Sequence, residues 1–103
     1  MTQRSAFVLH LQPDRIDEYV AAHRSVWPDM LEALRNAGIS NYTIFRAGNN
    51  VIGYFEADDL ERARVYLAAQ PVCTRWQDAM AELLDERVSD AGPPPLEEIF
   101  RLD

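Results

Sequence analysis

Apolar and polar positions change their spacing several times along the chain, and each change predicts an element. Residues 5–11 (SAFVLHL) form a short apolar run that Gln12 and Pro13 stop, which predicts a buried strand. The apolar side chains that follow recur every three or four positions, which predicts a helix. The inward-facing stripe of this helix consists of Ile16, Tyr19, Val20, His23 and Trp27.

The ends of this helical stretch carry recognisable signals. Asp14 can cap its start, with Asp17 in the capping-box position. Pro28 bends or restarts the helix, because proline lacks the backbone N–H that a helix interior needs. The apolar positions continue to Leu34, and Gly38 is expected to stop the helix.

Two strand-like segments and a second helical stretch follow. Residues 41–46 (NYTIFR) and 51–57 (VIGYFEA) flank the turn sequence Ala-Gly-Asn-Asn, which predicts a hairpin. A helical stretch is then expected from residue 58 or 59 to about residue 85, with a pause at Pro71.

The C-terminal part predicts a stiff connector at residues 90–95 (DAGPPP) and a closing strand at residues 96–102 (LEEIFRL). The order βαββαβ is that of a ferredoxin-like α+β fold. Helices on one face of such a sheet leave its other face open, and Tyr42, Ile44 and Tyr54 are expected there. Because these side chains are too apolar to stay in water, we expect two sheets to pair in a homodimer.

Length and charge limit the partners. The chain has 103 residues, which suits a single domain (1–103), and a formal net charge of −7. Nucleic acid and anionic membrane surfaces both need a basic face, so neither is expected as a partner. No apolar run approaches the ~20 residues of a membrane span. A small neutral molecule is the expected ligand.

Rare residue types exclude whole reaction classes. All ten basic residues are Arg, so a Schiff-base lysine and a P-loop are both excluded. Two histidines cannot form a three-histidine metal site within one subunit. Cys73 is the only cysteine, which excludes an internal disulfide and indicates a reducing, cytoplasmic setting.

His23 is the first candidate for chemistry, because it lies in the middle of an inward-facing stripe. It is either a core histidine with satisfied hydrogen bonds or a general acid or base that faces a pocket. Its ordinary pKa of about 6.5 suits proton transfer in both directions near neutral pH. Tyr19 lies one helical turn earlier and can reach the same small volume, either as a core residue or to orient a ligand.

The remaining candidates are aromatic residues and a second histidine. Trp27, Tyr42 and Trp76 are either core residues or flat faces for the apolar C–H side of a sugar. His10 lies in the first strand on the same side as Val8, and is either a second proton-transfer group or a packed residue.

Together these residues resemble the L-rhamnose mutarotase family over nearly the whole chain. The spacing Tyr-x3-His-x3-Trp-Pro at residues 19–28, followed by Val-Cys-x-Arg-Trp at residues 72–76, is a specific combination. Further matching positions are Ala6, Phe7, Val8, Glu18, Asn41, Tyr42, Ile44, Met80, Phe100 and Leu102.

The resemblance implies a dimeric ferredoxin-like fold of the α/β-barrel type. It also implies an isomerase of the aldose 1-epimerase type, which interconverts the α and β anomers of a 6-deoxy-hexose such as L-rhamnose or L-fucose. Neither a metal nor a cofactor is implied, and the expected substrate is a small neutral monosaccharide.

The resemblance also implies roles for individual residues. His23 matches the proton donor, while Tyr19, Tyr42 and Trp76 match residues that contact the sugar. Family members usually have two successive tryptophans where this chain has Trp76 and Gln77, so Gln77 is expected at the sugar and bears on which sugar is bound. The complementary base stays open between Tyr19, His10, a carboxylate and a bound water.

Two other functions are compatible with the same pattern. Dimeric ferredoxin-like barrels include cofactor-independent oxygenases, which use an aromatic-lined pocket with a histidine. A non-catalytic interaction domain would instead keep Tyr19 and His23 merely packed in its core.

Overall fold

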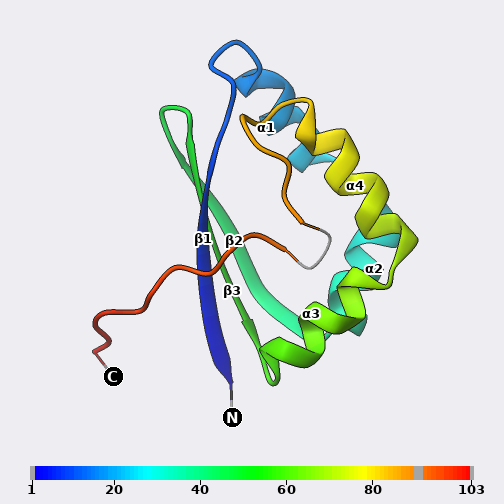
Figure 1. Ribbon diagram of the computed structural model, residues 1–103, viewed down its shortest axis with the longest axis vertical. Coiled ribbons are helices and arrows are strands. Elements are labelled where there is room, and N and C mark those ends of the chain that lie inside the picture. Colours follow the sequence, from blue (N-terminus) through cyan, green and yellow to red (C-terminus); the bar gives the residue numbers. More distant parts are fainter. Residues whose placement is uncertain (1, 90–91, 103) are drawn as a thin grey trace.

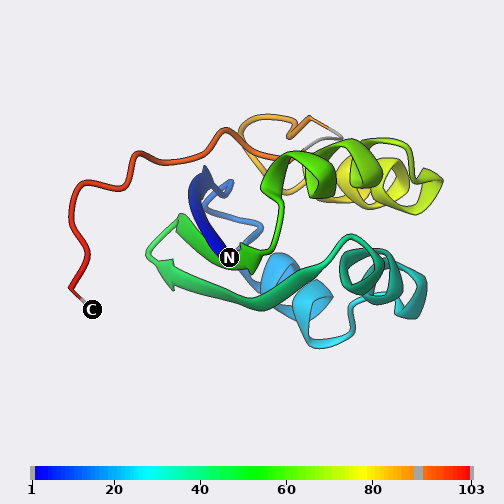
Figure 2. The same ribbon diagram turned by 90° about the horizontal axis from the view of Figure 1, so that it is seen from below.

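The computed structural model describes residues 2–89 and 92–102 as a three-stranded sheet with four helices. The elements are β1 (Gln3–His10), α1 (Ile16–Arg24), α2 (Pro28–Asn36), β2 (Ile39–Ala47), β3 (Asn50–Ala57), α3 (Leu60–Ala68) and α4 (Pro71–Ala81). The strands are antiparallel in the order β1-β3-β2. All four helices lie on one side of the sheet (Figure 1). Figure 2 shows that they form two groups, α1 with α2 and α3 with α4. The expected α+β class with a ferredoxin-like arrangement is confirmed.

Proline divides each predicted helical stretch into two helices. Pro28 and Pro71 occupy first-turn positions of α2 and α4, where the missing N–H leaves no hydrogen bond unmade. The stop after α2 is also as predicted, since Gly38 adopts a φ of 85° that favours glycine. Asp59 caps α3 by accepting a hydrogen bond from the backbone N–H of Arg62 at 3.0 Å. No helix in the described part of the chain is long and apolar enough to cross a bilayer.

Two predicted helix boundaries are wrong. Asp14 does not cap α1: the helix begins at Ile16, and Arg15 at its N-cap position makes no side-chain capping bond but pairs with Glu18. Helix α4 ends at Ala81 rather than near residue 85. The chain there turns to lie beside the end of β1, where the N–H of Asp85 donates to the carbonyl of His10 at 2.9 Å.

The predicted closing strand does not form within the described residues. Segment 92–102 contains no strand, although the N–H of Leu96 donates to the carbonyl of Ala6 at 2.7 Å. That bond lies on the free edge of β1. Three successive prolines before it remove backbone donors, so no ladder extends in that direction. We call residues 96–102 the C-terminal arm, and Figures 1 and 2 show it leading away from the helices. The first two residues of the predicted connector, 90 and 91, lie outside the described residues.

The core lies between the sheet and the helices. Phe7, Leu9 and Val51 are buried on the helix side of β1 and β3, together with Tyr19, Met30, Cys73 and Trp76 from the helices. Gly53 pairs directly with Phe7 across the two strands. A side chain on Gly53 would overlap the Phe7 ring, so glycine allows this ring to lie over β3.

A β-bulge decides which face of the sheet Tyr42 occupies. The register shifts between Ser40 and Thr43, and Asn41 has a φ of 50°, so two residues of β2 oppose one residue of β3. Tyr42 therefore lies on the same side as Phe55, with ring centroids 5.3 Å apart.

The expectation that Tyr42 and Ile44 lie on the open face is therefore wrong. Both line the space under the helices. Alternation instead assigns Tyr54 to the open face, as predicted, with the cross-strand row Val8, Ile52 and Phe45 beside it.

Replacing Gly53 with Ala should lower the free energy of unfolding by about 1–3 kcal/mol, because the new methyl group overpacks the Phe7 ring. Urea denaturation measures this change. In a Phe7→Leu background the same substitution should be less damaging, with a coupling of about 0.5 kcal/mol or more. Equal damage in both backgrounds would show that the Phe7 ring is not the obstacle.

Candidate active site

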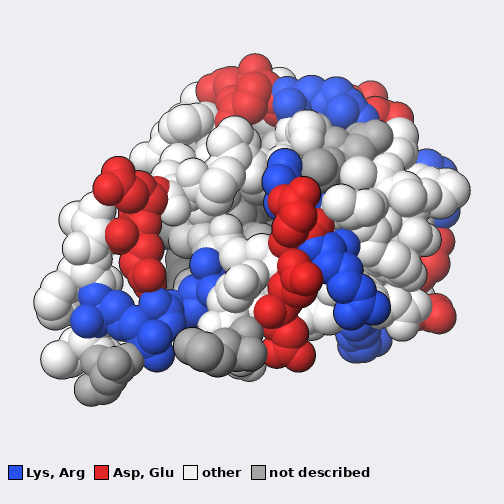
Figure 3. Space-filling model, turned by 60° about the horizontal axis from the view of Figure 1, so that its bottom comes forward, with Lys and Arg blue, Asp and Glu red and all other residues white. Residues whose placement is uncertain are grey.

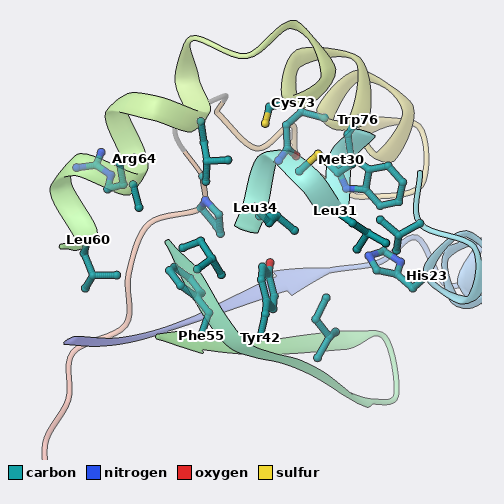
Figure 4. A pocket seen from close by; sticks show the side chains of 18 residues that line it. His23, Met30, Leu31, Leu34, Tyr42, Phe55, Leu60, Arg64, Cys73 and Trp76 are labelled. Carbon is teal, nitrogen blue, oxygen red and sulfur yellow. The ribbon is translucent and has the colours of Figure 1, made fainter. Parts of the chain in front are cut away.

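A pocket of about 430 Å³ lies between the helices and the sheet. Its walls come from α1, α2, α3, α4, β2 and β3, and from residues 92–93 of the segment that precedes the C-terminal arm. Figure 4 shows His23 and Trp76 at one end of this pocket and Leu60 and Arg64 at the other, with Tyr42 rising from the sheet between them. The pocket thus contains four of the predicted site residues: His23, Tyr42, Trp76 and Gln77.

The tautomer of His23 follows from its position on α1. Its Nδ1 lies 2.9 Å from the backbone carbonyl oxygen of Tyr19, one turn earlier. Because a carbonyl only accepts, Nδ1 carries the hydrogen. In the neutral ring, Nε2 is then the atom with a free lone pair. Nε2 can therefore accept a proton or hold one.

Burial lowers the pKa of His23 below its usual value of 6.5, and the hydrogen bond to the Tyr19 carbonyl opposes this only in part. The cause is desolvation, which disfavours the charged imidazolium. At neutral pH the ring is therefore mostly uncharged and can act as a base in its resting state.

Aromatic rings hold the imidazole from two sides. The Tyr19 ring lies 4.3 Å from that of His23 between centroids, and the Trp76 ring lies 5.4 Å away at 82°. Trp27 packs edge-on against Trp76 at 5.1 Å from outside the pocket. Trp27 therefore supports the site without lining it.

Tyr19 and Tyr42 have different places in the site. Tyr19 is buried behind the imidazole and does not line the pocket, and burial raises its pKa to about 12. Tyr42 lines the pocket; burial of its phenol and, secondarily, the neighbouring Tyr19 raise its pKa. Both phenols stay protonated near neutral pH, so Tyr42 can donate a hydrogen bond to a ligand oxygen.

Gln77 adds a neutral polar group to the wall. It lies on α4 one residue after Trp76 and is half-buried. Among the described residues its amide makes no hydrogen bond. Both its donor and its acceptor are therefore available to a ligand.

His10 does not belong to this pocket. It lies at the end of β1, with about half of its side chain exposed, and its Nδ1 is 3.6 Å from a carboxylate oxygen of Glu86. Within this protomer His10 therefore neither lines the pocket nor packs in the core.

Several charged side chains form ion pairs at the surface. Arg4–Glu98, Arg64–Glu61, Arg75–Asp29 and Arg87–Asp78 all form exposed pairs. Figure 3 shows acidic and basic groups side by side on one face, with uncharged surface between them. Within residues 2–89 and 92–102, no cluster of three or more His, Cys, Asp or Glu side chains could hold a metal ion.

The sequence did not identify one half of the pocket. Leu34, Leu60, Ala63, Arg64 and Leu67 line it, but the helical periodicity of the apolar members is the same as that of core residues. The sequence contains no signal that separates a cavity wall from a packed core at these positions.

Known proteins resemble this chain over nearly its whole length. The family model described as L-rhamnose mutarotase matches residues 4–102. An L-rhamnose mutarotase from Pectobacterium atrosepticum is 35% identical, over 97% of this chain and 98% of the relative. One from Bacillus subtilis is also 35% identical, over 98% of this chain and 99% of the relative.

Solved structures agree with the fold. The crystal structure of an L-rhamnose mutarotase from Formosa agariphila superposes with a TM-score of 0.77 at 28% identity, covering 98% of this chain and 99% of the other. A tetracenomycin F2 cyclase from Streptomyces glaucescens gives a TM-score of 0.70 over 98% of this chain and 97% of the other. At 21% identity the cyclase shows a shared fold alone.

The imidazole of His23 should titrate with a midpoint below 6.5, because burial favours its neutral form. Proton NMR of the Hε1 resonances against pH measures this midpoint, and the spectrum of His23→Gln identifies which resonance belongs to His23. A midpoint at or above 6.5 would contradict the desolvated environment.

Proposed function

Because the chain belongs to the L-rhamnose mutarotase family, we propose that it catalyses exchange between the α and β anomers of L-rhamnose. The observation that supports this most directly is the anchored imidazole of His23, whose Nε2 is free at the wall of a pocket with few polar groups. Mutarotation breaks no C–C or C–H bond and needs only proton transfer between two oxygens.

In the proposed reaction Nε2 of His23 takes the proton of the anomeric hydroxyl. The C1–O5 bond then breaks, its electron pair remains on O5, and the imidazolium gives the proton to O5. The free aldehyde rotates about C1–C2, and the same steps in reverse close the ring on the other face of C1. His23 is thus the base toward O1 and the proton donor toward O5. The lowered pKa of His23 suits both steps, because the resting ring is neutral and its imidazolium is a ready acid.

The other residues of the pocket are proposed to hold the sugar. Tyr42 and Gln77 would form hydrogen bonds with its hydroxyl groups, and the Trp76 ring would contact its apolar C–H face. Tyr19, which lies behind His23, is proposed to act through the imidazole and through the phenol of Tyr42. L-fucose differs from L-rhamnose only in its stereochemistry, and its relative rate tests how far Gln77 selects the sugar.

Replacing His23 with Gln should reduce the catalysed exchange rate about 10²–10⁴-fold, because the proton-transfer group is lost. Saturation-transfer NMR on L-rhamnose measures the exchange. The matched control is His10→Gln, which removes the exposed histidine outside the pocket and should leave the rate unchanged. An unchanged rate in a folded His23→Gln protein would remove His23 from the mechanism.

We further propose that the protein is a homodimer. The open sheet face carries the apolar row Val8, Ile52 and Phe45. The side chain of Phe45 is 62% exposed. The C-terminal arm adds further exposed apolar side chains: Leu96, Ile99, Phe100 and Leu102. A second copy of the chain would cover both surfaces at once.

Phe45→Glu should convert the dimer into a monomer, because it buries a charge in the proposed interface. Sedimentation velocity measures the mass. Val65→Glu is the matched control, since Val65 is 63% exposed on α3, away from the open face, and its substitution should preserve the dimer. A monomeric wild-type protein, or a dimeric Phe45→Glu variant, would contradict this proposal.

A cytoplasmic location is also proposed. It is supported by the cysteine usage of the chain: Cys73 is its single cysteine, which excludes an internal disulfide.

A further inference from the structure

The pocket has two chemically different ends. At one end, the ring of His23 contacts the ring of Trp76, which belongs to the main core. At the other end, Ile39, Leu60 and Leu67 pack against a separate cluster of buried alanines, Ala37, Ala57 and Ala63. Figure 4 shows Leu60 and His23 on opposite sides of the cavity, with Leu34 and Phe55 between them.

The end formed by Leu60, Leu67, Ile39 and Ala63, called here the distal end, is apolar. Arg64 is its one charged wall residue among those described, and its guanidinium lies 3.1 Å from the carboxylate of Glu61 on the same helix. Because the positive charge of Arg64 is balanced by the negative charge of Glu61, the distal end offers little attraction to an anion. An uncharged apolar group suits it.

The pocket is too large for one sugar ring. Cavities of about 300–1,000 Å³ enclose drug-sized ligands, and this one measures about 430 Å³. A pyranose held by His23, Tyr42 and Gln77 would leave the distal end empty. Apart from Arg64, which pairs with Glu61, the described wall of that end offers no polar side chain to the hydroxyl groups of the sugar, and an unpaired buried hydroxyl is unfavourable.

We propose that the distal end is a subsite for an apolar, uncharged substituent on the substrate, which makes the substrate class 4-O-substituted 6-deoxy-hexoses with a free anomeric centre. This rests on the proposed function. With C1 and O5 at Nε2 of His23, the opposite edge of the ring is the C3–C4 bond, and C4 lies directly across from the reacting carbon C1. A substituent on O4 then points away from His23 toward Leu60 and Leu67. An alkyl, acyl or aryl group there would bury its apolar surface.

The test compares L-rhamnose with 4-O-benzyl-L-rhamnose. Saturation-transfer NMR gives kcat/KM for exchange of each sugar, and isothermal titration calorimetry gives each Kd. The wild-type protein is expected to bind the benzyl sugar about tenfold or more tightly than L-rhamnose, since filling an apolar pocket with one small group already gives about 10–200-fold discrimination.

Leu60→Trp fills the distal end and should reduce the ratio of kcat/KM for the benzyl sugar to that for L-rhamnose by about tenfold or more. Val65→Trp is the matched control, because Val65 lies on the same helix with its side chain in solvent, and it should leave this ratio unchanged. An unchanged ratio in a folded Leu60→Trp protein would overturn the subsite.

Calorimetry separates this proposal from the proposed function. Tighter binding of the benzyl sugar without exchange of either sugar would support the subsite and overturn the mutarotase activity. Exchange of L-rhamnose with no tighter binding of the benzyl sugar would overturn the subsite and support the activity. The wild-type Kd values decide this even where Leu60→Trp does not fold.

Discussion

The floor of the pocket depends on the missing side chain at Gly53. Because β3 has no Cβ there, the ring of Phe7 lies over its backbone and fills the centre of the sheet. Tyr42 meets Phe7 edge-on at 6.2 Å, and Phe55 contacts both rings. These three rings form one aromatic layer on the sheet side of the pocket.

Local signals were enough to predict most of the fold. The prolines at residues 28 and 71, Gly38, and the hairpin turn act within a few residues of their own position, so their effects follow from backbone chemistry alone. Helical spacing also predicted that His23 faces inward, because α1 can bury only one stripe against the core, but spacing left open whether a pocket lies there. Identifying Tyr42, Trp76 and Gln77 as neighbours of His23 required the family resemblance, since they come from distant elements.

What the sequence did not reveal depends on pairing between distant segments. The bulge at Asn41 reverses the alternation of β2, and its side chain bonds to Glu56 on the neighbouring strand at 2.8 Å. The sequence carries no local signal for this bulge, so Tyr42 was expected on the wrong face. The closing strand failed for a similar reason: it was predicted from the residues of segment 96–102 alone, but a strand forms only where a partner edge accepts a full ladder.

The group that orients His23 is a main-chain carbonyl, and this changes what selection must preserve. A carbonyl at position 19 is present whatever side chain stands there, and the helix sets its distance from the imidazole through backbone geometry. The helix backbone therefore determines that Nδ1 carries the hydrogen, and no second side chain is needed for this. Side chains that line the pocket around His23 can therefore be substituted without a change in the tautomer of its imidazole. A fold with this arrangement can diverge in substrate without rebuilding its proton chemistry.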